Sequence, residues 1–361
     1  MSDLPLRPEL VGARPYGAPQ IDVPIRLNTN ENPYPPPPEM IADIAAGIAP
    51  DLNRYPDRDA VALRAALAGY LAQQVGVPVH ADQVWAANGS NEILQQILQA
   101  FGGPDRTALA FQPGYTMHEL ISRGTGTRFI GVPRDLRLGA EDIAAAVRDY
   151  CPDVLFLCSP NNPTGESLSP DVIAAAYEAV AQTQTGIVVV DEAYAEFASV
   201  DSAVTLLNGR PRLIVSRTMS KAFAFAGARV GYLAADPALI EALQLVRLPY
   251  HLSSLTQGAA IVAVRHATRL GDQVRHLCRT RDDFVRRVSA MGWRCAPSDA
   301  NFVLLGPFTD PTHAWQRLLD HGILVRDIGL PPWLRVTIGT DDQMTALADV
   351  LATLDELRET S

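Results

Sequence analysis

The sequence contains few cysteines, fewer basic than acidic residues, and no long apolar run. Its 40 acidic and 30 basic residues give a formal net charge of −10, which argues against a nucleic-acid-binding surface because such surfaces need clustered Lys and Arg. No apolar stretch approaches the roughly 18–20 residues that cross a bilayer. Residues 1–8 lack the basic start and apolar core of a signal peptide. We therefore expect a cytoplasmic protein that binds neither nucleic acid nor membrane.

The four cysteines are Cys151, Cys158, Cys278 and Cys295. They form no C-x-x-C pair and lie among apolar or strand-like residues. This spacing predicts free, buried thiols in a reducing compartment and no zinc site. No other group of residues indicates a metal, so we expect the protein to work without one.

A length of 361 residues suffices for two domains. Residues 1–38 are rich in proline, which predicts an extended N-terminal arm. Apolar residues alternate from Ile21 to Leu27 and favour an arm that packs on the small domain or on a partner subunit, rather than a disordered tail. We assign residues 39–250 to a large domain that binds the cofactor and residues 251–361 to a smaller one.

Helix-like and strand-like segments alternate through the large domain. Residues 154–158 and 187–190 are short apolar runs, typical of parallel strands buried on both faces. We predict an α/β fold with a doubly wound, mostly parallel sheet, joined to a smaller α+β domain. The predicted strands are 83–87, 107–111, 128–132, 154–158, 187–190, 213–216, 229–234, 302–305, 323–325 and 334–338; the predicted helices are 60–74, 89–100, 141–149, 237–246, 256–290 and one that starts at 341.

The most informative segment is 216–232, which places Lys221 among small and apolar residues. A partly desolvated amine near another cation has a lowered pKa and becomes a nucleophile toward a carbonyl. The hydroxyls of Thr218 and Ser220 and the guanidinium of Arg229 are groups that bind a phosphate dianion. Together they indicate a phosphorylated aldehyde held on the lysine as a Schiff base, which describes pyridoxal 5′-phosphate. The simpler interpretation is a surface loop with an ion-paired lysine.

Further polar groups follow strands, at the edge where open α/β sheets bind ligands. Gly89-Ser90-Asn91 begins a helix and could bind an anion or simply cap that helix. Residues 159–165 form a stiff turn that holds two asparagines. Asp191 ends a buried strand and needs a partner, either an ordinary basic residue or a pyridinium nitrogen that it keeps protonated. Tyr194 could then hydrogen-bond the phenolic oxygen of the same ring.

These motifs, in this order, resemble the fold-type I pyridoxal-phosphate-dependent aminotransferases of the class I/II branch. The matching runs are Asn88–Glu92, Ser159–Gly165, Asp191–Tyr194, and Ser220–Lys221 together with Ala226–Gly231. Each run alone is a weak signal, whereas the set in this order is specific. The resemblance implies pyridoxal 5′-phosphate as cofactor. It also implies that Lys221 binds the cofactor covalently and moves a proton between the substrate Cα and the cofactor.

The resemblance further implies how the cofactor is held. Tyr115 would stack on the pyridine ring, Asn162 and Tyr194 would contact its hydroxyl, and Asp191 would contact its nitrogen. Tyr55 would reach the phosphate from the neighbouring subunit, so a homodimer with a shared active site is expected. The residues implied to hold the phosphate within one chain are Ser90, Asn91, Thr218, Ser220 and Arg229.

Within this family the chain is most similar to the histidinol-phosphate aminotransferases. The similarity runs from about residue 14 to residue 350. It is carried by Leu27–Pro33, Arg54–Asp57, Gly322–Asp327 and Leu334–Thr340. It implies amino transfer between L-histidinol phosphate plus 2-oxoglutarate and imidazole-acetol phosphate plus L-glutamate, a step of histidine biosynthesis.

In this branch Arg335 and Arg326 are implied to bind the substrate phosphate. Tyr16 and Asn30 of the arm are implied to close over the substrate. Two arginines match a phosphate dianion better than one does, because each can pair with it in a bidentate manner. Arg326 could instead pair with Asp327 or with another acidic residue at the domain surface.

Other functions would use the same cofactor residues. An aromatic amino-acid aminotransferase, acting on phenylalanine or tyrosine, would use Arg335 for the substrate carboxylate. A pyridoxal-phosphate-dependent decarboxylase of a phosphorylated amino acid would release carbon dioxide without a keto-acid acceptor. A cofactor-sensing regulator needs a DNA-binding region before the matching segment, for which the chain has no room. The sequence leaves open whether Tyr250 and His251 line the imidazole pocket.

Overall fold

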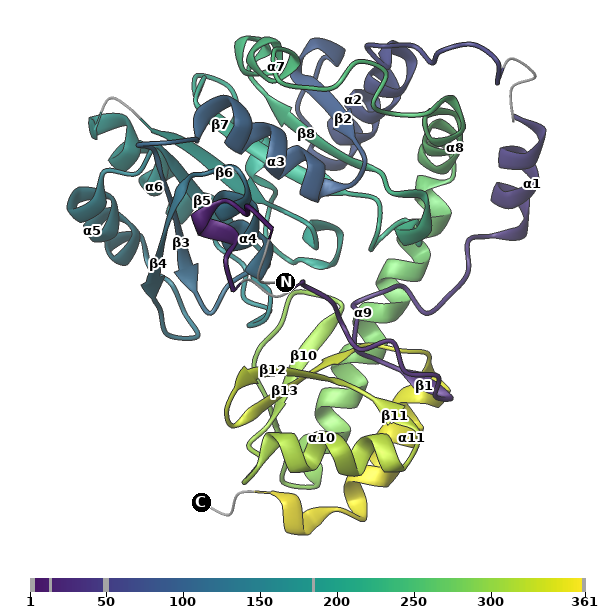
Figure 1. Cartoon of the computed structure of the whole chain (residues 1–361). Coiled ribbons are helices and arrows are strands. Elements are labelled where there is room, and N and C mark those ends of the chain that lie inside the picture. The colour runs from purple at the N-terminus through teal and green to yellow at the C-terminus, as the bar shows by residue number, and fades with distance from the viewer. Residues whose placement is uncertain (1–3, 13–14, 48–51, 184–185, 359–361) are drawn as a thin grey trace.

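A seven-stranded sheet forms the centre of the larger part of the molecule (Figure 1). The computed structural model describes residues 4–12, 15–47, 52–183 and 186–358. The strands are β2 (Val84–Ala87), β3 (Thr107–Gln112), β4 (Arg128–Pro133), β5 (Val154–Cys158), β6 (Ile187–Asp191), β7 (Leu213–Thr218) and β8 (Gly231–Ala235). They lie in the order β2-β8-β7-β6-β5-β3-β4, and β8 runs antiparallel to both of its neighbours. This mostly parallel sheet confirms the predicted α/β fold class.

The central strands are apolar because both faces of the sheet are buried. In β5, Leu155 and Leu157 join one core, whereas Val154 and Phe156 point to the opposite face and join another. Helices α2, α5 and α6 cover the face of Leu155, and α3, α4 and α7 cover the other (Figure 1). Their bounds are α2 (Val61–Val75), α3 (Ser90–Phe101), α4 (Thr116–Gly124), α5 (Ala140–Tyr150), α6 (Pro170–Thr183) and α7 (Pro237–Gln244).

The predicted strands of this sheet are all present, with ends shifted by at most two residues. Asp57, three residues before the N-cap Ala60 of α2, accepts hydrogen bonds from the N–H groups of Asp59 (3.0 Å) and Val61 (2.7 Å). Helices α4 and α6 were not predicted. The chain also forms short 3-10 helices: η1 (Pro8–Leu10), η2 (Ala81–Gln83), η3 (Ala195–Phe197), η4 (Ala203–Leu206), η5 (Ala226–Ala228) and η6 (Asp355–Leu357).

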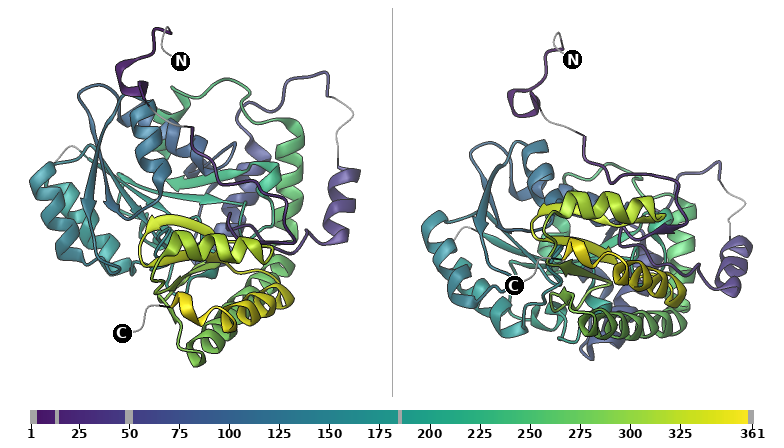
Figure 2. Two further views of the ribbon diagram at one scale, coloured as in Figure 1. Left: turned by 60° about the horizontal axis from the view of Figure 1, so that its bottom comes forward. Right: turned by 90° about the horizontal axis from the view of Figure 1, so that it is seen from below.

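The smaller part is built on a four-stranded antiparallel sheet in the order β12-β13-β10-β9. Its strands are β9 (Arg294–Cys295), β10 (Phe302–Gly306), β12 (Arg326–Leu330) and β13 (Trp333–Thr337). Three helices pack beside it, α9 (Ala267–Ala290), α10 (Pro311–Asp320) and α11 (Asp341–Ala352), and Figure 2 shows them from below. Strand β12 was not predicted, because the polar run Arg326-Asp327 lacks a strand's apolar alternation. Helix α10 was not predicted either, although Asp310 caps it and Pro311 stands at its first position.

The N-terminal arm lies along the smaller part of the molecule. Strand β1 (Ile25–Arg26) pairs in parallel with β11 (Ile323–Leu324). Leu27 continues this pairing through its N–H to the carbonyl of Leu324 (2.7 Å) and its carbonyl to the N–H of Thr337 (3.0 Å). The expected alternation from Ile21 to Leu27 therefore forms a strand of only two residues.

The arm is followed by α1 (Pro38–Ala46). The proposed domain bounds of 1–38, 39–250 and 251–361 stay predictions. They include residues 1–3, 13–14, 48–51, 184–185 and 359–361, which lie outside the described residues.

The predicted helical stretch over residues 256–290 is present but is divided into two helices. Two helices, α8 (Ser254–Arg265) and α9, meet at His266. The N–H of His266 closes the last turn of α8, and its Nε2 lies 2.8 Å from Oδ2 of Asp43 on α1. Helix α8 packs on α1 and α2, whereas α9 packs on β9 and α11, and the change of direction between α8 and α9 is visible in Figure 1.

The four cysteines are free thiols. The prediction that all are buried is wrong: Cys158, Cys278 and Cys295 are half-buried, and Cys151 is exposed just after α5 in a left-handed conformation with φ 42°. None of the described helices is long and apolar enough to cross a membrane. Within the same described residues, no three His, Cys, Asp or Glu side chains are placed to hold a metal ion.

A buried ion cluster lies beneath the carboxyl end of the sheet. Nε of Arg217, on β7, donates to Oε2 of Glu192 (2.8 Å), and its Nη1 donates to Oε1 of Glu196 (3.0 Å). All three side chains are at most 8% exposed. Ser202 joins them, since its hydroxyl accepts from Nη2 of Arg217 (2.8 Å) and donates to Glu192 (2.7 Å). The cluster fixes the segment after β6, which leads from Asp191 to Tyr194.

We expect Arg217→Met to lower the free energy of unfolding by about 3–5 kcal/mol, because it leaves two buried carboxylates without a cation. Urea unfolding followed by circular dichroism measures the change. The matched control is Arg106→Met, since Arg106 is 53% exposed and pairs with Asp153 at 2.9 Å, and an exposed pair contributes about 1 kcal/mol or less. Equal losses in the two variants would contradict the assigned role of the buried cluster.

Candidate active site

A cavity of about 410 Å³ lies where the carboxyl ends of the parallel strands meet the small domain and the arm. Its walls come from segments far apart in the sequence. One predicted site residue, Tyr55, does not line the cavity of its own chain. The predicted residues that do line it are Tyr16, Asn30, Ser90, Asn91, Tyr115, Asn162, Asp191, Tyr194, Thr218, Ser220, Lys221, Arg229, Arg326 and Arg335.

The turn between β2 and α3 forms one wall. Gly89 has a φ of +84°, a left-handed value that glycine adopts readily. Gly231 of β8 packs so closely on this turn that a Cβ there would lie 2.2 Å from the nitrogen of Ser90. Ser90 begins α3, so the positive end of the helix faces the cavity.

Arg229 lies directly over this turn. A Cβ on Gly89 would meet its Nη2 at 2.6 Å, and its Nη1 lies 3.5 Å from the hydroxyl of Ser220. The Thr218 hydroxyl in turn donates to that of Ser220 (3.0 Å). Arg229 itself has a φ of +56°, an uncommon value for a residue with a side chain and one found at ligand-binding positions. A guanidinium, two hydroxyls and a helix N-terminus thus surround one place that suits an anion.

We call the site formed by Ser90, Thr218, Ser220 and Arg229 the phosphate cup. Lys221 follows it in the chain and points its amine toward the arm, where Nζ donates to the carbonyl of Thr29 (3.2 Å). Desolvation by burial lowers the pKa of Lys221, and the cations Arg335 and Arg229 lower it further, while Glu31 opposes them. The resulting pKa is about 8 instead of 10.5. The amine is therefore partly neutral near physiological pH, as a nucleophile or base must be.

Asp191 ends β6 at the floor of the cavity and is 1% exposed. Its Oδ2 lies 3.1 Å from Nε2 of His118, whose ring stacks on Phe156 at 4.5 Å. Its Oδ1 has no hydrogen-bond partner among the described residues. A buried carboxylate oxygen without a donor is costly, so this atom marks a place where a ligand N–H belongs.

Tyr194 and the arm form the opposite wall. The hydroxyl of Tyr194 accepts from Nδ2 of Asn30 (2.9 Å), and burial raises the pKa of Tyr194 to about 12. Asn30 is held in a left-handed conformation (φ 54°) by its N–H, which donates to the hydroxyl of Thr337 (2.9 Å). Tyr16 lies at the rim and is 55% exposed. The arm is therefore fixed at Asn30 and open at Tyr16.

Two arginines of the small domain reach into the same cavity. Arg335 donates to Oδ1 of Asn162 (2.7 Å) and to the carbonyl of Asn28 (2.8 Å), and desolvation lowers its pKa. Arg326 donates to the carbonyl of Gly17 (3.5 Å). The alternative ion pair with Asp327 is not formed among the described residues, because that carboxylate accepts from Thr312 Oγ1 (3.1 Å) and from the N–H of Gly329 (2.9 Å).

Of three further aromatic residues, only Tyr115 lies in the cavity. Tyr115 lines the cavity, and its hydroxyl donates to Oδ1 of Asn91 (3.0 Å). Tyr250 stacks on Tyr55 with ring centroids 4.5 Å apart, away from this cavity. His251 also lies outside it, with Nε2 2.9 Å from the carbonyl of Ala86. Neither Tyr250 nor His251 lines a pocket for the substrate of its own chain.

The residues present fit pyridoxal phosphate. The cup of Ser90, Thr218, Ser220 and Arg229 suits its phosphate, and the amine of Lys221 suits its carbonyl. The unpartnered Oδ1 of Asp191 suits its ring N–H. Asn162, Tyr194 and Tyr115 lie on the remaining walls, where the resemblance expects contacts with the ring.

The fold and this arrangement define a class of enzyme, the class I and II aminotransferases. The model of that family matches residues 22–351. The chain therefore belongs to the class I and II aminotransferase family.

Relatives within the family carry a more specific name. A histidinol-phosphate aminotransferase of Frankia casuarinae is 58% identical over 96% of this chain and 89% of its own length. One of Mycolicibacterium smegmatis is 56% identical over 94% of this chain and 90% of its own length. A crystal structure of histidinol-phosphate aminotransferase from Sinorhizobium meliloti, in complex with pyridoxal-5'-phosphate, has a TM-score of 0.86 at 26% identity over 98% of both chains. The predicted resemblance to this branch, the enzyme class and the cofactor are thereby confirmed.

The contact of His118 with Asp191, and the fact that Lys221 is the single lysine, were not used to predict the site from the sequence. His118 was not singled out, because a lone histidine on the unpredicted helix α4 gives no sign that it will contact Asp191. Lys221 carried a stronger signal than the motif alone, because it is the single lysine of the chain. Every other basic side chain is arginine or histidine, so only one ε-amine exists to serve as nucleophile.

We expect the amine of Lys221 to titrate near pH 8 in the cofactor-free folded protein. Its rate of acylation by a water-soluble activated ester, read by mass spectrometry of the single lysine peptide, should rise with a midpoint near that pH. The same protein in urea is the control, with a midpoint near 10.5. A midpoint near 10.5 in the folded protein would contradict the assigned environment.

The same shift makes stability depend on pH. Between pH 8 and 10.5 the unfolded chain binds more protons at Lys221 than the folded chain does. The contribution of Lys221 to the free energy of unfolding is therefore fully present above pH 10.5, and it is lost as the pH falls from 10.5 to 8.

Proposed function

We propose that the protein transfers an amino group between L-histidinol phosphate and 2-oxoglutarate, giving imidazole-acetol phosphate and L-glutamate, in histidine biosynthesis. The observation that carries this proposal is a second anion site, formed by Arg335 and Arg326, in the same cavity as the cofactor cup and Lys221. Histidinol phosphate carries a phosphate where ordinary amino acids carry a carboxylate. The names of the relatives support the same substrate.

Pyridoxal phosphate, when bound, supplies an electron sink that stabilises negative charge at the substrate carbon. Asp191 would hold the ring nitrogen through Oδ1, and His118 orients that carboxylate from behind through Oδ2. A charged acceptor at this place keeps the ring nitrogen protonated. The cup of Arg229, Ser220 and Ser90 would hold the phosphate and so orient the ring.

Lys221 is the group placed to move a proton at the substrate carbon. With a pKa of about 8, Nζ can accept a proton near neutral pH and return it. Tyr194 stays protonated there, because burial raises its pKa to about 12, so its hydroxyl can donate a hydrogen bond to the ring oxygen. The carbonyl of Thr29 in the arm accepts from the amine, and Asn30 next to it donates to the hydroxyl of Tyr194.

Arg335 and Arg326 orient the substrate. Arg335 is buried and already fixed by Asn162 and Asn28, so it can bind an anion with little loss of conformational freedom. Arg326 approaches from β12 beside the open rim at Tyr16. A phosphate bound by both would place the substrate amine toward Lys221.

The expected homodimer and the cytoplasmic location are part of this proposal. Tyr55 is 80% exposed, and Leu245 and Leu248 expose 85% and 73% of their surfaces on a neighbouring segment. Large exposed apolar side chains of this kind support a subunit interface. In such a dimer Tyr55 would reach the cofactor phosphate of the other copy.

The half-reaction with purified, cofactor-loaded protein tests the substrate. We expect the absorbance of the bound cofactor to change faster with L-histidinol phosphate than with L-phenylalanine, because only the former engages both arginines. Stopped-flow absorbance measures each rate separately. The reverse order would make the protein an aromatic amino-acid aminotransferase, and release of carbon dioxide without a keto acid would make it a decarboxylase.

The two arginines should differ in their effects. We expect Arg326→Leu to lower kcat/KM for histidinol phosphate by about 10- to 100-fold, the value of one charged hydrogen-bonding contact, and to leave phenylalanine unchanged. Arg335→Leu should lower kcat/KM for both substrates. Equal losses on both substrates in Arg326→Leu would contradict this division of roles.

A further inference from the structure

Tyr55 lies on a segment, residues 54–60, that belongs to neither a helix nor a strand. Its side chain is 80% exposed, and its only ring contact among the described residues is with Tyr250, at 4.5 Å and an interplanar angle of 15°. An exposed tyrosine on an irregular segment would lose much conformational freedom on binding. If it is to complete a ligand site, something must hold this segment in place.

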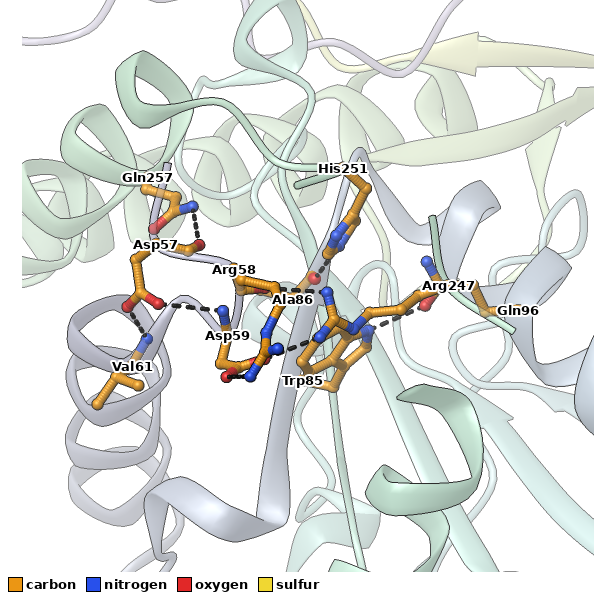
Figure 3. A network of polar contacts seen from close by, with 10 residues as sticks. All are labelled: Asp57, Arg58, Asp59, Val61, Trp85, Ala86, Gln96, Arg247, His251 and Gln257. Atoms are coloured by element: carbon orange, nitrogen blue, oxygen red, sulfur yellow. Dashed lines mark hydrogen bonds and ion pairs between the residues drawn. The ribbon is translucent and has the colours of Figure 1, made fainter. Parts of the chain in front are cut away.

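Arg247 is the side chain that reaches the segment from outside (Figure 3). Its Nη1 donates to the carbonyl of Arg58 (3.2 Å), and its Nη2 donates to Oδ1 of Asp59 (2.8 Å). Its guanidinium also lies over the ring of Trp85, 5.3 Å from the centroid. The side chain is 8% exposed. A planar group with two hydrogen bonds and a stacked face has little freedom left.

Trp85 connects this contact to the phosphate cup. Its Nε1 donates to Oε1 of Gln96 (2.9 Å) on α3 (Figure 3). The amide of Gln96 lies 3.4 Å from Oε1 of Glu92, and Oε2 of Glu92 accepts from the backbone N–H (2.6 Å) and the side chain (2.7 Å) of Asn88. Asn88 precedes Gly89 and Ser90, so the contacts end at the turn that would bind the phosphate.

A second set of contacts also connects the segment 54–60 to Asn88. Nδ2 of Asn88 donates to the carbonyl of His251 (2.8 Å), the neighbour of Tyr250. The imidazole of His251 stacks on Trp85 (5.4 Å) and contacts the carbonyl of Ala86 (Figure 3). Gln257 donates to the carbonyls of Asp57 and Leu252, both at 2.9 Å. The segment of Tyr55 is thus tied to the phosphate turn of its own chain by two routes.

We propose that Arg247 is a positioning residue that fixes Tyr55 so that its hydroxyl completes the cofactor phosphate site of a second copy of the chain. The inference rests on the proposed function and its dimer. Arg247 would touch neither cofactor nor substrate, since both of its hydrogen bonds go to the segment 54–60. The rigid link to the turn at Asn88 keeps each Tyr55 at a constant distance from the cup on its own chain. Two copies related by symmetry therefore present each tyrosine to the other's cup in one geometry.

A double-mutant cycle on cofactor affinity tests the proposal. The full-length cofactor-free protein is titrated with pyridoxal phosphate, and binding is followed by tryptophan fluorescence and absorbance. We expect Tyr55→Phe and Arg247→Met each to weaken binding about tenfold or more, the value of a hydrogen bond to a charged group. The double variant should bind no more weakly than Tyr55→Phe alone, because Arg247 acts through Tyr55.

Three controls complete the experiment. Arg287→Met removes an arginine that pairs with Asp349 at 2.5 Å, far from the cup, and should bind the cofactor as the wild type does. Asp59→Ala removes the oxygen that accepts from Nη2 of Arg247 and should reproduce part of the loss if Arg247→Met does not fold. Sedimentation velocity shows that each variant is compared in the same oligomeric state.

Additive losses in the double variant would overturn the proposal, as would wild-type affinity in Tyr55→Phe or in Arg247→Met. A monomeric Arg247→Met that binds the cofactor as tightly as the wild type would overturn it too. These outcomes are distinct from failure of the proposed function, which would show as a wild-type protein that does not convert histidinol phosphate.

Discussion

One guanidinium holds the three walls of the active-site cavity together. Arg335 extends from β13 of the small domain over the ring of Phe302 (5.5 Å), donates to Asn162 of the large domain and donates to the carbonyl of Asn28 in the arm. Asn30 of the arm makes a second connection of this kind, to Tyr194 of the large domain and to Thr337 of the small one. Burial contributes most to the lowered pKa of Lys221, and the charge of Arg335 beside it lowers that pKa further. The cavity walls and the reactive amine therefore share this side chain.

The site uses the ends of buried strands in a consistent way. Asp191 and Thr218 end β6 and β7, so rigid elements carry the groups that would meet the ring nitrogen and the phosphate. The cost of burying Asp191 is offset on one oxygen by His118. The cluster around Arg217 keeps the following segment in place. Polar and charged groups at the ends of packed strands hold fixed positions, because the strands that carry them cannot move independently.

Much of the fold and the site could be predicted from the sequence. Apolar runs such as 154–158 fix the central strands, since only a strand buried on both faces is apolar throughout. Lys221, Thr218, Ser220 and Arg229 are close in sequence, so local turns bring them together. The break at His266 was not predicted, because the helical pattern continues across it. Strand β12 was missed because its polar residues lack a strand's apolar alternation, whereas helix α10 was missed although Asp310 and Pro311 form a helix start signal.

The sequence by itself determined the order of strands and helices, the phosphate-binding motifs and the single nucleophilic amine, because each depends on residues within a few positions of one another. Only the tertiary structure decided that His118 lies behind Asp191, that Arg335 joins the arm to the large domain, and that Arg247 connects Tyr55 to the turn at Asn88. These contacts join residues 73 to about 307 positions apart. Side chains so distant in the chain meet only when the packed core fixes the elements that carry them, and no local pattern encodes that meeting.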